Sequence, residues 1–470
     1  MLDRLPVHVT RFGSRGRASR RRWLVSLGAW VLAAGIACGV SAVPTATQPP
    51  ATPRSPATVA APSTPAGDIP AQPPANTNPT VSGAGHTATP PPEPPASEPQ
   101  AATLVIPSVT VRIPPVRVPM VDTSIHSVPL GKILFDTFGG FPRALPLDRA
   151  SKGQILDFQD VIVPIASPVY GDSDDLSWLE DGDLVMGYVS GEKAFAYPIN
   201  VLNLHEIVND EIDGVPLLVT YCPLCFSGVV YHRELGGRLL TFGNTSALYQ
   251  SDLVMYDHQT GSYWFQVAGE AVVGTLTGSR LKLLPSTTMF WGEWKRLYPE
   301  TRLLTGTAQS PRAFDGGRYR RGFPGNFQDQ INKGRFIFPV DEEKLDDRLD
   351  KGEIVLTVEV GDAATAFPLG IIGDGAVNHQ VGGQPVVVFA RAGSRAVGAF
   401  SPVVDGRRLT FDYREDTESF FDRETGTRWD EAGRGVSGSL AGAQLPRLDT
   451  RRAFWFSIAI ALPKVEVYLP

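Results

Sequence analysis

The strongest constraint on the fold is an internal repetition, because the stretch from Gly182 to Pro463 carries one pattern of landmarks twice. Each copy has, in the same order, an aromatic residue before proline, Val-Asn, Gly-Xaa-Pro, Gly-Arg-Xaa-Leu-Thr-Phe, Asp-Xaa-Xaa-Thr-Gly-Xaa-Xaa-Trp and Phe-Trp. These landmarks begin at Tyr197, Val208, Gly214, Gly237, Asp257 and Phe290 in copy one, and at Phe367, Val377, Gly383, Gly406, Asp422 and Phe454 in copy two. A residue kept in both copies is expected to serve the fold, whereas a reactive residue present in one copy is free to serve chemistry.

Short alternating or β-branched runs separated by turn residues predict strands throughout both copies. In copy one these runs are Leu184–Val189, Val215–Thr220, Gly228–Tyr231 and Arg238–Phe242. Apolar spacing predicts helices over Pro198–Asn209, over Thr288–Tyr298 and, as the echo of the latter, over Ala453–Leu462. We therefore expect a β-rich α+β fold made of two tandem, internally duplicated β units with a few short helices.

The first 42 residues predict an export signal or signal anchor. Arg20, Arg21 and Arg22 precede an uncharged, mostly apolar run over Trp23–Ala42, which is the arrangement of an export signal and fits its twin-arginine type. Cleavage after Ala42, retention as a membrane anchor and lipid attachment at Cys38 are alternatives that the sequence leaves open. We expect an extracytoplasmic protein, secreted or tethered to the outer face of the cytoplasmic membrane, with the cell envelope as its partner.

A disordered linker is expected over residues 43–106, where proline, alanine and threonine dominate. Val43–Gln100 holds 17 of the 41 prolines in the chain, a composition that cannot bury a core and favours an extended spacer. We assign residues 107–310 to an N-terminal extension plus copy one, residues 311–352 to a connector and residues 353–470 to copy two.

Composition and missing motifs exclude several classes of function. The formal net charge is −6, and the only dense arginine cluster lies within the first 22 residues, so nucleic-acid binding is not expected. The chain has no Gly-Xaa-Ser-Xaa-Gly, no phosphate-binding loop and no His-Glu-Xaa-Xaa-His. Hydrolase and nucleotide-binding interpretations therefore have no positive support, and no nucleotide cofactor is expected.

Soft metal ligands are concentrated in copy one, around the segment Cys222-Pro223-Leu224-Cys225. Matching the landmarks places Arg391 opposite Cys222, Ser394 opposite Cys225 and Asp374 opposite His205. The same matching gives Thr417 opposite Asp252 and Phe420 opposite Met255. We therefore predict a metal site in copy one, with Cys222 and Cys225 as ligands, His205 as the third, and Met255 and Asp252 as further candidates.

Copper or zinc is the metal predicted by this set of donors. Two thiolates with an imidazole and a thioether form a soft set, which suits copper and leaves zinc possible, and which does not suit magnesium or calcium. Whether the protein is an enzyme, and which substrate or redox partner it meets, stays open at the level of sequence.

Two other interpretations of the cysteine pair stay open. Thiol–disulfide exchange uses Cys-Pro-Xaa-Cys at a helix N-terminus, but the residues after Cys225 predict a strand. A structural disulfide in a non-catalytic envelope scaffold or ligand-binding module is the second alternative.

Acidic and aromatic residues of the Asp257–Trp264 motif are interpreted as structural, because the motif recurs at Asp422 and has the composition of a turn before a strand. Asp252, Asp257 and Glu270 would supply the paired carboxylates that a glycosidase needs, but no spacing in the sequence fixes their separation.

Three combined motifs resemble the bacterial and archaeal family called domain of unknown function 3179. They are Tyr221-Cys222-Pro223-Leu224-Cys225, Gln250–Asp257 and Gly269-Glu270-Ala271, and the likeness extends over roughly Ile125 to Pro463. The resemblance implies an exported or membrane-tethered protein with a Cys-Pro-Xaa-Cys hallmark and no settled activity. The family usually has glycine after the second cysteine, where this chain has Phe226, and a metal knuckle uses that glycine to turn and to aim backbone N–H groups at sulfur.

Overall fold

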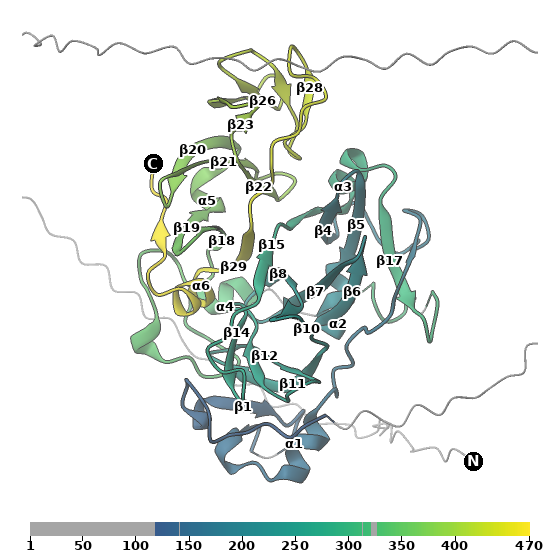
Figure 1. Cartoon of the computed structure of the whole chain (residues 1–470), viewed down its shortest axis with the longest axis vertical. Helices are drawn as coiled ribbons and strands as arrows, with labels where there is room; N and C mark the ends of the chain where they lie inside the picture. Colours follow the sequence, from purple (N-terminus) through teal and green to yellow (C-terminus); the bar gives the residue numbers. More distant parts are fainter. Residues whose placement is uncertain (1–117, 141, 313, 321–326) are drawn as a thin grey trace, which may run out of the picture. The chain divides into compact units, whose positions relative to one another are not determined.

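The computed structural model describes residues 118–140, 142–312, 314–320 and 327–470 (Figure 1). The predicted export segment, including Cys38, and the whole of the predicted linker over residues 43–106 lie outside the described residues. Within the described ranges, no helix has both the length and the apolar character needed to cross a membrane.

An N-terminal extension leads into the first copy and adds two strands to one of its sheets. It consists of η1 (Leu130–Lys132), β1 (Ile133–Asp136), β2 (Ala144–Pro146), η2 (Leu147–Arg149), α1 (Lys152–Phe158) and β3 (Pro168–Gly171). Helix α1 begins with a capping box, in which the side chains of Ser151 and Gln154 each accept from the other's backbone N–H.

Residues 184–307, called the first half below, are rich in strands. Its elements are β4 (Leu184–Ser190), β5 (Lys193–Pro198), α2 (Ile199–His205), β6 (Ile207–Ile212), β7 (Val215–Cys222), β8 (Ser227–His232), β9 (Glu234–Leu235), β10 (Arg238–Leu239), β11 (Phe242–Tyr249), β12 (Asp252–Asp257), β13 (Tyr263–Phe265), β14 (Glu270–Val273), β15 (Lys282–Leu284), β16 (Thr287–Phe290), α3 (Trp291–Leu297) and β17 (Arg302–Thr307).

Residues 354–467, called the second half below, follow α4 (Phe327–Asn332) and η3 (Glu342–Lys344). The elements of the second half are β18 (Ile354–Val360), β19 (Ala363–Pro368), α5 (Leu369–Ile372), β20 (Gly375–Val381), β21 (Gln384–Arg391), β22 (Ala396–Phe400), β23 (Val403–Val404), β24 (Arg407–Arg408), β25 (Phe411–Arg414), β26 (Ser419–Asp422), β27 (Arg428–Trp429), β28 (Gly435–Ser437), β29 (Thr450–Phe454), α6 (Trp455–Ala461) and β30 (Glu466–Val467). The described chain is therefore β-rich with a few short helices, as the sequence predicts.

Both halves pair their first and last strands in the same way. In the first half β4 pairs antiparallel with β16, and β5 pairs parallel with β17. In the second half β18 pairs antiparallel with β29, and β19 pairs parallel with β30.

The Asp-Xaa-Xaa-Thr-Gly-Xaa-Xaa-Trp motif has the same geometry in both halves. Trp264 Nε1 donates to Asp257 Oδ2 at 3.0 Å, and Trp429 Nε1 donates to Asp422 Oδ2 at 2.9 Å. These matching contacts support the structural interpretation of that motif.

One sheet joins the two halves, because β29 of the second half pairs with β8 of the first half (Figure 1). Its strand order is β30-β19-β18-β29-β8-β7-β6, with β15 also paired to β8. Two backbone hydrogen bonds cross between the halves in a reciprocal manner. The N–H of Phe454 donates to the Cys225 carbonyl at 2.9 Å, and the N–H of Phe290 donates to the Ser394 carbonyl at 3.1 Å. Each half thus donates one backbone hydrogen bond to a turn of the other half.

The predicted helix over Pro198–Asn209 is too long at its C-terminal end. Helix α2 ends at His205, and Glu206 takes a left-handed conformation with φ 59°. Ile207 and Val208 then pair with Thr220 and Val219 in β6 and β7. Burial of these β-branched residues in a sheet overrides the helical spacing of the sequence.

The predicted helices over Thr288–Tyr298 and Ala453–Leu462 begin too early. Thr288 to Phe290 belong to β16, and Ala453 and Phe454 belong to β29, so the helices start at Trp291 and Trp455. The predicted strand over Arg238–Phe242 is interrupted as well, because β10 ends at Leu239 and β11 begins at Phe242.

Candidate metal centre

A tight hairpin connection holds the two cysteines. Cys222 is the last residue of β7 and pairs with Ser227, the first residue of β8, so that Pro223 to Phe226 form the turn. Both cysteines are buried, with exposed fractions of 1% for Cys222 and 0% for Cys225, and both are free. The turn brings the two sulfurs to one place without a helix.

Phe226 occupies the last position of this turn, where the resemblance of the motifs predicts glycine. Its φ of 54° is left-handed, a conformation that glycine adopts without strain and phenylalanine does not. The ring stacks on Phe454 with centroids 5.5 Å apart and meets the edge of Tyr221 at 6.0 Å. Packing of the ring therefore offsets the backbone strain at this position.

Asp252 comes to the cysteines from a second turn, between β11 and β12. Gln250 and Ser251 both have left-handed φ values, of 53° and 60°, and Asp252 then begins β12 with an exposed fraction of 0%. Its carboxylate accepts from the N–H of Leu253 at 2.9 Å and from the N–H of Val267 at 3.0 Å. The backbone of two segments thus fixes the carboxylate before any ligand binds.

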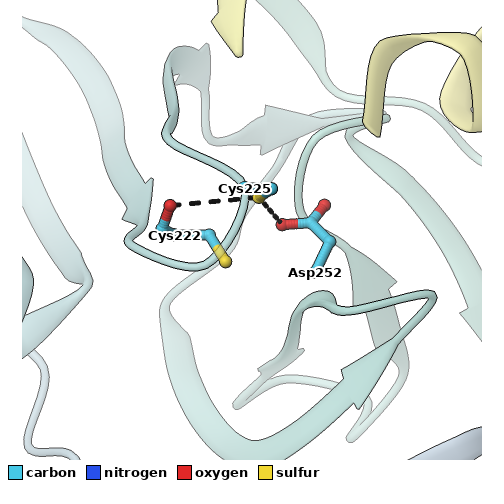
Figure 2. Close-up of side chains that lie close together, drawn as sticks. All are labelled: Cys222, Cys225 and Asp252. Carbon is cyan, nitrogen blue, oxygen red and sulfur yellow. Dashed lines mark hydrogen bonds between the residues drawn. The ribbon is translucent and has the colours of Figure 1, made fainter. Parts of the chain in front are cut away.

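Figure 2 shows Cys222, Cys225 and Asp252 converging in the interior. Their two sulfurs and one carboxylate oxygen all lie within 4.8 Å of one another. Cys225 Sγ and Asp252 Oδ1 are 2.8 Å apart. In a tetrahedral zinc site, sulfur and oxygen ligand atoms lie about 3.5 Å apart, so small adjustments of the side chains suffice to surround an ion.

Hydrogen-bond acceptors outnumber donors around Cys225. Gln266 Nε2 donates to the Ser227 carbonyl at 3.3 Å, which leaves Gln266 Oε1 to accept from the Ser227 hydroxyl at 2.6 Å. The only hydrogen of Ser227 Oγ is then engaged, so this oxygen faces Cys225 Sγ, 3.0 Å away, as an acceptor. Asp252 Oδ1 is a second acceptor, and one S–H group serves only one of them.

Burial controls the ionisation of all three groups. It raises the pKa of the Cys222 thiol and raises that of the Cys225 thiol well above its usual range, and the hydrogen bond with Cys222 acts in the same direction on Cys225. Burial also raises the pKa of Asp252 to about 6, although the hydrogen bonds from Cys225 and from the Val267 N–H act to lower it. Among the described residues, none of the hydrogen-bond partners of these groups is a cation.

A cavity of about 230 Å³ reaches Cys222 and is lined by Glu206 and Asn244 as well. Asn244 Nδ2 donates to Glu206 Oε2 at 2.7 Å. Burial raises the pKa of Glu206 to about 7 against the lowering effect of that hydrogen bond, and the Asp252 charge adds to the rise. Glu206 was not among the predicted site residues, although the sequence did carry a signal for it, since the second copy has Gly375 at the matching position.

The structure does not bring His205 to the sulfurs. Its Nδ1 lies 2.7 Å from the Val163 carbonyl and its Nε2 lies 2.9 Å from the Tyr319 hydroxyl. The ring also packs against Phe314 and Tyr319. Because α2 ends at His205 and the chain then turns through left-handed Glu206, it is Glu206 that reaches Asn244 and the cavity beside Cys222.

Met255 is fully buried on β12, within the same apolar cluster as Cys222 and Cys225. It pairs across the sheet with Asn244 and Trp264. Its role as a ligand stays a prediction, and its place among Phe242, Leu253 and Trp264 is that of a core residue.

A comparison with family models matches residues 159–464 to the family described as "Protein of unknown function (DUF3179)", in agreement with the resemblance of the motifs. No curated protein and no solved structure matches the chain.

Proposed function

Because the chain belongs to the DUF3179 family, whose description assigns no activity, we propose a function from the site itself: Cys222, Cys225 and Asp252 bind a metal ion. The observation that carries this proposal is the convergence of three buried atoms that can bind a metal ion. Around one of them, Cys225 Sγ, hydrogen-bond acceptors outnumber the hydrogens available to them. A bound cation replaces the thiol protons and balances the acceptor oxygens that remain.

Zinc fits the three donors better than copper. Zinc accepts both cysteine sulfur and carboxylate oxygen, whereas copper(I) prefers sulfur and imidazole. With His205 engaged elsewhere, the third donor near the sulfurs is an oxygen. Copper remains the second metal of the proposal.

Three protein ligands leave a coordination position for an exchangeable ligand. Closed structural zinc sites have four protein ligands, whereas sites with three leave the fourth to water or substrate. The cavity beside Cys222 supplies the space, and the Glu206 carboxylate lines it. The arrangement favours a reactive or ligand-exchanging centre over a structural knuckle.

Thiol–disulfide exchange is the second candidate, because two free cysteine sulfurs lie within 4.8 Å of each other. Against it, burial raises the pKa of both thiols, and the pair lies between two strands and not at a helix N-terminus. Attack by a thiol needs its thiolate form, which this setting disfavours in the absence of a metal ion.

We further propose that the protein works outside the cytoplasm, at the cell envelope. Support comes from the arginine cluster, the apolar run and the proline-rich linker in residues 1–106. The metal site then serves an envelope function, and its substrate or partner reaches it from that compartment.

Elemental analysis combined with thiol counting on the full chain, purified after native export, tests the metal site. We expect one zinc or copper ion per chain and two thiols protected from alkylation. Cys222→Ser and Asp252→Asn are expected to lower the metal content about tenfold or more at equal protein. Ser394→Ala is the matched control, because Ser394 stands opposite Cys225 in the second half and should leave the content unchanged. A metal-free protein with a Cys222–Cys225 disulfide would support the exchange function or the scaffold.

A further inference from the structure

Two adjoining cavities open where the Cys-Pro-Leu-Cys turn meets the second half. Their volumes are about 470 and 210 Å³, and they share Gln328, Ile354 and Arg395 as lining residues. Phe226 and Phe290 line the larger cavity, and Arg452 lines the smaller one. Together they have the size and mixed lining of a small-molecule site, and they are separate from the cavity that contains Glu206.

Arg452 is buried in this region without a carboxylate partner. Its exposed fraction is 4%, and only its Nη1 makes hydrogen bonds, to the carbonyls of Thr288 at 2.6 Å and Arg395 at 3.1 Å. Within the described residues, its Nε and Nη2 have no partner. Burial and the neighbouring Arg395 charge lower the pKa of Arg452 to about 10. The guanidinium of Arg452 is therefore still charged at neutral pH. A buried guanidinium left in this state is costly unless an anion joins it.

Arg395 adds a second free positive charge at the same place. No ion pair involves its side chain among the described residues, and its guanidinium lies 5.9 Å from the centre of the Phe290 ring. Its φ of 53° is left-handed, as is that of Phe226 at the matching turn of the first half. Left-handed backbone in a non-glycine residue persists only where the surrounding structure holds it in place. The turn therefore fixes the position of the Arg395 side chain.

The carboxylates that line the two cavities do not neutralise these arginines. Asp183 accepts from the N–H of Glu180 at 2.8 Å, and Glu353 accepts from the N–H of Gly370 at 2.7 Å. Arg391, the third arginine of the smaller cavity, is already paired with Glu418 and Glu431. Among the described residues that line the cavities, the cationic groups without an ion-pair partner are therefore Arg395 and Arg452.

We propose that these cavities bind a small organic oxoanion. Its carboxylate or phosphate group lies on Arg395 and Arg452, and its remaining atoms lie against the aromatic rings of Phe226 and Phe290. Guanidinium groups match the geometry of both kinds of acid group, and the adjoining volume of about 470 Å³ accommodates the rest of a sugar-sized molecule. Because none of the metal donors takes part, this inference stands apart from the metal site.

Isothermal titration of the full chain with glucuronate, glucose 6-phosphate and glucose tests the proposal and identifies the acid group. We expect at least one of the two anions to bind at one site per chain, and glucose not to bind. Arg395→Gln should weaken anion binding about tenfold or more, since hydrogen bonds to charged groups contribute at least that much. Arg452→Met should abolish the rise in melting temperature caused by the anion, while raising the melting temperature of the free protein.

Arg408→Gln is the matched control, because Arg408 is exposed on the β23–β24 hairpin, and it should bind the anion like the natural chain. Metal content should be the same in Arg395→Gln as in the natural chain. The proposal is overturned if neither anion binds at about 10 mM, if glucose binds as tightly as the anions, or if both arginine variants keep full affinity.

Discussion

At the scale of single residues, two non-glycine residues hold the matching turns of the two halves in left-handed backbone. Phe226 offsets the strain by stacking on Phe454, whereas Arg395 is exposed and its guanidinium lies beside the Phe290 ring. The two positions therefore share a backbone geometry and differ in what the side chain contributes.

Phe226→Gly should lower the free energy of unfolding, and Arg395→Gly should not. Relief of left-handed strain is worth about 1 kcal/mol, but removal of a packed aromatic ring costs about 3 kcal/mol. We expect a net loss of about 2 kcal/mol for Phe226→Gly and a change within about 0.5 kcal/mol for Arg395→Gly, measured by urea denaturation. Equal losses in both variants would show that ring packing does not decide the difference.

The pH dependence of stability should carry the signature of Glu206. Its pKa is raised to about 7 in the folded protein, so its contribution to stability is present below its usual pKa of 4.5 and is lost as pH rises to 7. Glu206→Gln removes this loss and should raise the free energy of unfolding of the metal-free protein at pH 8 by about 2 kcal/mol. Glu211→Gln, on the exposed side of β6, is the control for a Glu→Gln substitution outside the cavity.

At the scale of elements, sequence patterns predicted strands well and helix ends poorly. The runs at Leu184, Val215 and Gly228 became β4, β7 and β8, because alternation and β-branching match what a sheet buries. Helix α2 ended four residues before the predicted Asn209, since the pairing of β6 with β7 is a tertiary contact that local spacing does not contain.

The candidate site was predictable in part for the same reason. The short spacing between Cys222 and Cys225 brings them together in the fold. Asp252 is a predicted candidate because the second copy has Thr417, and no carboxylate, at the matching position. The direction in which His205 faces depends on where α2 ends, and so does the exposure of Glu206 to the cavity. Glu206 therefore lines the cavity beside Cys222, while the neighbouring His205 contacts Val163 and Tyr319 instead of the sulfurs.

Close packing between strand and helix makes Gly187 on β4 a sensitive position. A Cβ at Gly187 would lie 2.0 Å from the Trp294 ring of α3, which has no room to move within the core. Gly187→Ala should lower the free energy of unfolding by about 3 kcal/mol through overpacking. Gly393→Ala, where a Cβ meets nothing within 4 Å, should change it by less than about 0.5 kcal/mol. Thermal denaturation of both variants would contradict this account if the two melting temperatures fell equally.

At the scale of the whole molecule, the two halves depend on each other. β29 lies between β18 and β8 in one sheet and pairs with β8 at Gly228, while β15 of the first half pairs with Val230 to His232. Removal of the second half therefore leaves the end of β8 beside the cysteine turn unpaired. The first half also loses Phe454, which donates to the Cys225 carbonyl and stacks on Phe226.

A chain ending at residue 310 should therefore fail to fold cooperatively and fail to retain metal. Addition of a separate fragment covering residues 311–470 should restore a sharp unfolding transition and metal content together, if association rebuilds the β8–β29 pairing. Circular dichroism and elemental analysis of the fragments, alone and mixed, give the measurement. A stable, metal-loaded first half on its own would contradict the dependence on β29.

The hydrogen bond from Phe454 to the Cys225 carbonyl has a kinetic consequence. The cavity beside Cys222 admits a small ligand to the ion, but a chelator that must displace Cys225 and Asp252, both fully buried, reaches them only when the strands around them separate. The rate of metal release should then equal the rate at which the β8–β29 pairing opens. At high chelator concentration this rate should no longer depend on how much chelator is present. A loaded molecule would thus stay loaded for far longer than the affinity of its donors alone implies.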